Sequence, residues 1–378
     1  MNSPQLCRWI AGALLLSTAL SGADNKPPAK KGVPATPGAP VAVTKPTDLT
    51  WPLPPDPPRV RWLAEYADMA KVKNPVVRKA SWIEKISGAK QPDEKLELRK
   101  PYGITTDSRG RIYAADTELK MVFVIDPVAR TVEKREGSSR APLSLPVGVA
   151  VDAENRLFVS DADLHSIICF SPEGQVLATF GTANLGRPGG IALDPQRKRL
   201  YVADAKLSQI AVFDSRTFEF RGHYGSATKK GSHELGTFLA PTNIAVDKQG
   251  TIYVADTWNN RIQILDPAGK VIRAFGAQGD RPGEFIRPKG IAVDSEGHIY
   301  VADAEFNNFQ IFSPEGLPLL AVGALGDAPG EFALIAGLYI DPQDRIYTTE
   351  MYHGRIQVLQ YISQPASADK GVTKASTR

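Results

Sequence analysis

Short apolar runs rich in β-branched and aromatic residues recur along residues 101–363, and six of these runs end in a carboxylate. Runs of about five residues with this composition, bounded by turn residues, predict buried β-strands. The intervals between the terminal carboxylates are 43–52 residues, so the chain contains an internal repeat. The six runs are residues 112–116, 157–161, 200–204, 252–256, 299–303 and 346–350.

Each repeat carries three further strand patterns around its carboxylate-ending run. One lies upstream and usually opens with Pro and a small residue; two lie downstream, as in residues 261–266 and 271–276. Four short strands joined by Gly, Pro and Asp turns are typical of a propeller blade. The repeats therefore predict an all-β fold, a six-bladed β-propeller, with the small residues of each first strand near the crowded axis.

The sixth repeat ends after its third strand, residues 355–361, and no fourth strand follows. Residues 59–66, ahead of the first repeat, have the pattern of the fourth strands elsewhere. We expect this N-terminal strand to complete the last blade, because closure removes two exposed strand edges. An open arc of six repeats with a frayed end is the alternative. The predicted propeller is residues 59–363.

The flanking segments differ from the repeats in composition. Residues 1–23 resemble a secretory signal, with Arg8, a 12-residue apolar run and small residues up to Ala23. An uncleaved membrane anchor is the alternative. Residues 24–58 hold 11 Pro in 35 positions and predict a disordered, extended linker. Residues 67–98 are a non-repeat insertion in which Ser81 opens a short helix, and residues 364–378 are a disordered tail.

Charge narrows the range of partners. Residues 101–363 hold 26 Lys and Arg against 31 Asp and Glu, so the predicted propeller is mildly acidic although the chain is +4 overall. A nucleic-acid-binding surface needs a basic stripe on the folded body, and none is visible. With the predicted export, these charges argue against a nucleic-acid partner and for a periplasmic or extracellular location. If the signal is cleaved, no membrane span remains.

The repeats resemble NHL repeats across essentially all of residues 99–363. The stretches that carry the resemblance are Gly-Asp-Arg-Pro-Gly-Glu-Phe (279–285), Pro-Lys-Gly-Ile-Ala-Val-Asp (288–294) and Tyr-Val-Ala-Asp (300–303). Gly-Asp-Ala-Pro-Gly-Glu-Phe (326–332) repeats the lead-in. The resemblance implies a six-bladed propeller. It does not select a function, because NHL propellers include protein-binding, RNA-binding, sensor and enzymatic domains.

One NHL-like enzyme class offers a test, the zinc-dependent peptidyl-hydroxyglycine amidating lyases. The resemblance places one zinc-binding His in a loop after an Asp-ending strand, where this chain has His165. The resemblance also implies two further zinc-binding His, each directly after the Pro that opens an inner strand. No inner strand of this chain has His at that position. The corresponding positions hold Tyr102, Val147, Gly189, Thr242 and Lys289. A metal-dependent lyase or hydrolase, using His165, His353 and a zinc or calcium ion, is therefore the alternative function.

The strand-end carboxylates and Cys169 have ordinary structural explanations. A carboxylate repeated in every blade is expected to accept hydrogen bonds from loop amides, as in Asx turns. Cys169 lies in a predicted third strand without a basic cluster nearby, which predicts a buried, unreactive thiol.

Departures from the repeat pattern locate the expected binding site on one rim of the propeller. The connection 222–240 is the longest, Asn replaces a Gly in one inner strand, and aromatic residues occupy equivalent loop positions of the last three blades. We expect an exported, monomeric, non-catalytic propeller that binds a protein or a small ligand at this rim and needs no cofactor. The expected binding residues are His223, Tyr224, Lys229, Lys230, His233, Asn243, Trp258, Phe306 and Tyr352.

Overall fold

A computed structural model describes residues 49–72, 97–138, 141–229 and 234–363. Contacts divide the chain into Met1–Lys45 and Pro46–Arg378, and every described residue belongs to the second unit. The predicted signal segment (1–23), the helix expected to begin at Ser81 and the tail (364–378) lie outside the described residues.

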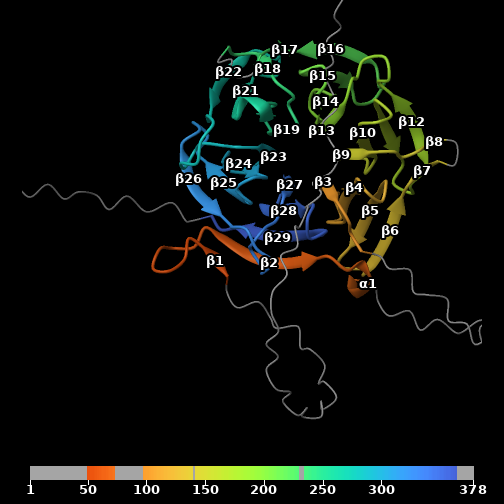
Figure 1. The fold of residues 1–378 in the computed structure, drawn as a ribbon. Helices are drawn as coiled ribbons and strands as arrows, with labels where there is room; N and C mark the ends of the chain where they lie inside the picture. The colour runs from red at the N-terminus through yellow and green to blue at the C-terminus, as the bar shows by residue number, and fades with distance from the viewer. Residues whose placement is uncertain (1–48, 73–96, 139–140, 230–233, 364–378) are drawn as a thin grey trace, which may run out of the picture. The chain divides into compact units, whose positions relative to one another are not determined.

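Six antiparallel sheets of four or five strands form a ring within this unit (Figure 1). Each inner strand contacts the inner strands of both neighbouring blades, and the contact between β27 and β3 completes the circle. The predicted all-β, six-bladed propeller is confirmed. The strands of the first five blades are β3 (Pro101–Thr106), β4 (Ile112–Asp116), β5 (Met121–Asp126) and β6 (Thr131–Arg135); β9 (Pro146–Val151), β10 (Leu157–Asp161), β11 (Ser166–Phe170) and β12 (Val176–Phe180); β13 (Pro188–Asp194), β14 (Arg199–Asp204), β15 (Gln209–Asp214) and β16 (Phe220–Tyr224); β19 (Asn243–Val246), β20 (Ile252–Asp256), β21 (Arg261–Leu265) and β22 (Val271–Phe275); β23 (Pro288–Val293), β24 (Ile299–Asp303), β25 (Asn308–Phe312) and β26 (Pro318–Val322).

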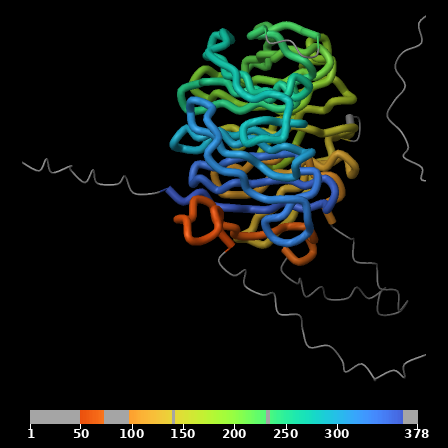
Figure 2. The backbone as a smooth tube through the Cα atoms, turned by 60° about the vertical axis from the view of Figure 1, so that its left-hand side comes forward, coloured from red at the N-terminus to blue at the C-terminus, as the bar shows by residue number. Residues whose placement is uncertain are grey.

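The last blade combines both ends of the propeller. Its strands β27 (Ile335–Ile340), β28 (Arg345–Glu350) and β29 (Arg355–Tyr361) are joined by β2 (Val60–Tyr66), with Val60 opposite Tyr361. The orange β2 and the blue β29 lie side by side in Figure 2. The predicted closure by residues 59–66 is therefore confirmed.

A fifth strand, β1 (Thr50–Trp51), extends the closing blade beyond β2. These two residues fall inside the segment assigned above to a disordered linker (24–58), so that assignment is wrong at its C-terminal end. The physical reason is a tertiary contact: the Trp51 indole packs on the core between blades 5 and 6 and covers Gly330. Pro-rich composition alone does not reveal such a contact.

The core is divided among the blade interfaces. Each of the six buried apolar clusters in the described chain joins residues of two adjacent blades, and the cluster between blades 6 and 1 closes the ring. In the cluster between blades 5 and 6, for example, Tyr300, Phe309, Ile335 and Leu359 are all fully buried. Burying one such side chain contributes about 1.5–3 kcal/mol, so interlocked blades hold the ring together.

Short elements complete the described chain. Two strand pairs lie in connections between blades: β7 (Gly137–Ser138) with β8 (Ala141–Pro142), and β17 (Ser226–Ala227) with β18 (Thr237–Phe238). Helix α1 (Met69–Val72) and the 3-10 turn η1 (Thr257–Asn259) are each a single turn. No helix within the described ranges is long and apolar enough to cross a membrane.

The inner strands crowd the axis, and blade 4 differs from the others. A Cβ at Gly337 would collide with the carbonyl oxygen of Tyr102 in the next blade, so this position requires glycine. The other five inner strands shift register near this level, whereas β19, with Asn243 at the equivalent position, pairs with β20 without a shift. The exchange of Gly for Asn therefore coincides with a local change in the sheet.

Candidate functional site

The buried carboxylate at the end of each second strand organises one face of the propeller. Asp161 accepts hydrogen bonds from the backbone amides of Ser144 and Leu145, in the connection between blades, and of Asp163 and Leu164, in its own loop. Asp116, Asp204 and Asp303 have the same four kinds of partner. The carboxylates therefore hold the loops of this face, called the rim below.

The rim of blades 4 to 6 is a continuous hydrogen-bonded belt. The Asn260 side chain donates to the carbonyl oxygen of Ile286 at 2.6 Å, which ties the loop of blade 4 to the connection that follows. In the next blade the backbone amide of Leu334 donates to Asn307 Oδ1 at 2.7 Å. Side chains on this belt are therefore carried by loops that are hydrogen-bonded to one another.

Large apolar side chains are exposed along the same belt. The exposed fraction is 75% for Tyr352, 71% for Leu325 and 53% for Trp258, while Ile286 and Leu334 are also exposed. Phe306 is half-buried. A groove of about 470 Å³ lies between blades 5 and 6, here called the rim groove. Its lining includes Asn307, Leu325, Ala333, Leu334, Tyr352 and His353.

The predicted binding residues do not form one cluster. Trp258, Phe306 and Tyr352 lie on the belt described above. His223 is exposed on the outermost strand β16, where its ring nitrogen Nε2 is 3.2 Å from the carbonyl oxygen of Asn184. Tyr224 belongs to the packing between blades 3 and 4, and its hydroxyl donates to the carbonyl oxygen of Pro267.

The remaining predicted residues lie elsewhere. Lys229 is exposed, and Lys230 and His233 lie outside the described residues. Asn243 faces the axis rather than the rim loops. The expectation of a single rim site that includes Tyr224 and Asn243 therefore needs correction. Tyr224 is used in packing, and Asn243 belongs to an inner strand whose free edge faces the axis.

The two histidines of the metal-dependent alternative belong to blades 2 and 6, which blade 1 separates. His165 is exposed in a loop, and His353 Nδ1 is 3.3 Å from Glu350 Oε2. Within the described ranges, no group of three or more His, Cys, Asp or Glu side chains is arranged to hold a metal ion.

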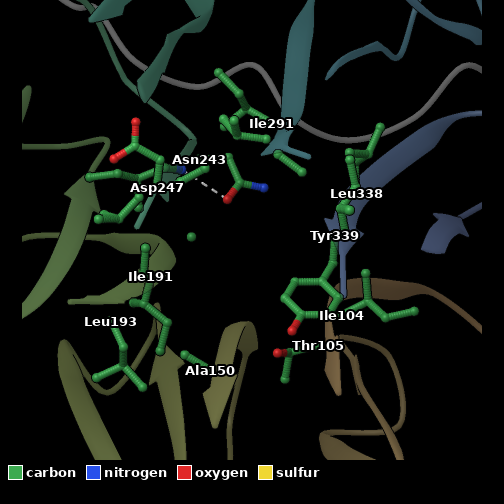
Figure 3. A pocket seen from close by; sticks show the side chains of 18 of the residues that line it. Ile104, Thr105, Ala150, Ile191, Leu193, Asn243, Asp247, Ile291, Leu338 and Tyr339 are labelled. Carbon is green, nitrogen blue, oxygen red and sulfur yellow. Dashed lines mark hydrogen bonds between the residues drawn. The ribbon is translucent and has the colours of Figure 1, made fainter. Parts of the chain in front are cut away.

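An axial cavity of about 560 Å³ was not predicted from the sequence. All six inner strands line it, and it extends to the turns between the first and second strands. Figure 3 shows the Asn243 amide and the Tyr339 ring pointing into this space from different blades. Asn243 Oδ1 accepts a hydrogen bond from the backbone amide of Ile244, which leaves the amide nitrogen directed toward the cavity. The one signal in the sequence was the exchange of Gly for Asn at this position.

The comparisons with known proteins agree with this architecture. Residues 237–309 match the family DUF5128, described as a 6-bladed beta-propeller. NHL repeat-containing protein 2 from Gallus gallus is 35% identical over 97 residues, which are 24% of this chain. The aligned part is only 13% of that relative's length.

Solved structures share the fold at low sequence identity. A catalytically inactive variant of virginiamycin B lyase from Staphylococcus aureus, solved with quinupristin, superposes with a TM-score of 0.53 at 14% identity, covering 72% of this chain and 83% of that chain. A protein of unknown function from Bacteroides thetaiotaomicron has a TM-score of 0.55 at 15% identity and covers 70% of each chain. Together with the repeats, these matches support an NHL-type six-bladed β-propeller.

Proposed function

We propose that this propeller is an exported binding protein without chemistry of its own, and that its rim groove and the flanking aromatic side chains receive a protein or a small ligand. The observation that carries the proposal is the exposure of Tyr352, Leu325 and Trp258 on one hydrogen-bonded belt. Exposed apolar side chains that gather on a rigid surface are typical of interaction sites. The proposal requires neither a cofactor nor a second copy of the chain.

Partner capture tests the rim. The protein is immobilised and exposed to an extract of the cells that produce it, and retained molecules are identified by mass spectrometry. Tyr352→Ala and Leu325→Ser should each reduce retention of a specific partner by about tenfold, as expected for anchor residues. Leu177→Ser and Ile272→Ser, at comparably exposed positions on the outer strands β12 and β22, should leave retention unchanged. Equal losses in all four variants would contradict a rim site.

Export is tested separately. Intact-mass measurement of the protein from the extracytoplasmic fraction should show a chain that begins near residue 24. A full-length chain found only in the cytoplasm would overturn the exported part of the proposal and leave the rim part untouched.

A further inference from the structure

The space enclosed by the ring of six inner strands is called the axial channel below, and at its rim-side end blade 5 carries a residue type that the other blades lack. The position directly before the axial Gly, or Asn243 in blade 4, holds Tyr102, Val147 and Ala336 in three blades, Gly189 and Thr242 in two more, and Lys289 in blade 5. Tyr102 and Val147 line the axial cavity. Lys289 is the only charged residue in this ring of positions, so it breaks the symmetry close to the axis.

Lys289 lies in an unusual setting for a lysine. It is half-buried, and its ammonium nitrogen is 5.3 Å from the ring centroid of Tyr102, which belongs to blade 1. Among the described residues, no carboxylate forms an ion pair with this ammonium group. Burial and the positive charge of Arg287 lower the pKa of Lys289. A charged group that is partly removed from water is favoured when an opposite charge joins it.

Two arginines reinforce the positive charge at this end of the channel. Arg287 pairs with Glu305 at 3.6 Å and Arg187 pairs with Asp163 at 3.9 Å, with all four side chains about half exposed. Ion pairs this long and exposed hold their partners weakly. Burial raises the pKa of Tyr102 to about 12, and the positive charge of Arg187 opposes that rise. Arg187 and Arg287 each directly precede the Pro that opens an inner strand, so cations of blades 3 and 5 lie at the same end of the inner strands as the contact between Lys289 and Tyr102.

The contact between the Lys289 ammonium and the Tyr102 ring explains part of this arrangement. A cation above an aromatic ring is attracted by the ring, and the lysine stem covers apolar surface. The contact does not supply an acceptor for the three N–H groups of the ammonium, which an oxyanion would supply. The rim groove of the proposed function lies between blades 5 and 6 and does not include Lys289, so the two sites are independent.

We propose that the rim-side end of the axial channel binds the oxyanion group of a small molecule, a carboxylate or a phosphate, with Lys289 as its charge partner. The Tyr102 ring forms the wall of the site, and Arg187 and Arg287 add positive charge. Tyr102 also lines the axial cavity, whose lining does not include Lys289, and apolar side chains there, such as Ile104, Ile191 and Leu338, accommodate the rest of the molecule. A cavity of about 560 Å³ is within the usual range for small-molecule sites.

Calorimetric titration at constant ionic strength tests this site with three probes: hexanoate, its uncharged analogue hexanamide, and inorganic phosphate. At least one of the two anions should bind the parent protein saturably with a Kd below about 10 mM. Comparison of hexanoate with phosphate shows which oxyanion is preferred. Hexanamide should bind at least about tenfold more weakly than hexanoate if the carboxylate is recognised.

Variants locate the binding. Lys289→Met should weaken anion binding by about tenfold or more, whereas Lys289→Arg should retain it within about threefold. Lys206→Met, which removes an exposed lysine from the loop of blade 3, should change the affinity by less than about twofold. Absence of saturable anion binding to the parent protein overturns the proposal whatever the variants do. Equal affinity in the parent and a folded Lys289→Met protein overturns it as well.

Discussion

The indole nitrogen of Trp62 donates a hydrogen bond of 2.7 Å to Gln357 Oε1, which joins two residues 295 positions apart. Gln357 also donates from Nε2 to the carbonyl oxygen of Glu331 and to Glu350 Oε1, each at 2.7 Å. One buried amide therefore connects the N-terminal strand, the last interblade connection and the strand-end carboxylate of blade 6. This contact gives ring closure a specific polar component in addition to strand pairing.

Replacing Trp62 by Phe should destabilise the propeller. The change removes the hydrogen bond to Gln357 while keeping an aromatic ring, and a net loss of about 0.5–1.5 kcal/mol is expected. The free energy of unfolding can be measured by urea denaturation followed by circular dichroism. Trp258→Phe, at an exposed rim position, is the matched control and should change stability by less than about 0.5 kcal/mol. Equal losses in the two variants would count against a closing role for Trp62.

The repeat pattern was sufficient to predict the blades and their closure because strand order in a propeller follows chain order. Contacts between distant segments were not predictable in the same way. Trp51, in a Pro-rich segment, packs on the core between blades 5 and 6, and the Tyr224 hydroxyl reaches Pro267 in the next blade. The sequence did not indicate the contact of Lys289 with Tyr102, because the two residues are far apart along the chain and meet only in the fold. The axial cavity was unpredictable for the same reason. Its walls are edges of strands from all six blades, and no local motif indicates them.

Removing one strand-end carboxylate should cost far more than removing a nearby exposed one. Asp161→Ala leaves the backbone amides of Ser144, Leu145, Asp163 and Leu164 without their acceptor, and a loss of about 2–4 kcal/mol is expected after partial rehydration. Asp163→Ala removes only the long, exposed contact with Arg187 and should cost less than about 1 kcal/mol. Urea midpoints at unchanged m-value compare the two. Similar midpoints would refute the organising role of Asp161.

Cys169 should be unreactive in the folded protein. Its side chain is fully buried, and burial raises the pKa of the thiol to about 11, so thiolate is scarce near neutral pH. In a Cys7→Ser background, a chromogenic disulfide reagent at pH 8 should label no thiol in the native state and one thiol after unfolding in guanidinium. Ser226→Cys, at an exposed position, provides the positive control and should react at once. Rapid labelling of native Cys169 would indicate that this strand opens.

The contact between His298 and Asp294 should make stability depend on pH. His298 Nδ1 lies 2.9 Å from Asp294 Oδ2, and this hydrogen bond, with the charges of Asp294 and Glu296, raises the pKa of His298 against burial and the charge of Arg59. A raised pKa means that the folded state favours the imidazolium. Its stabilising contribution is fully present below the unfolded pKa of about 6.5 and is lost as the pH rises through the higher folded value.

The Tm difference between the parent protein and His298→Gln should therefore be largest near pH 6 and shrink toward pH 9. The equivalent position of blade 6 holds Arg345, whose Nε donates to Asp341 at 2.6 Å. Because a guanidinium stays charged over this range, the Tm loss in Arg345→Gln should not change with pH between 6 and 9. A His298→Gln difference that is constant or grows over the same range would show that the contact does not depend on the imidazolium.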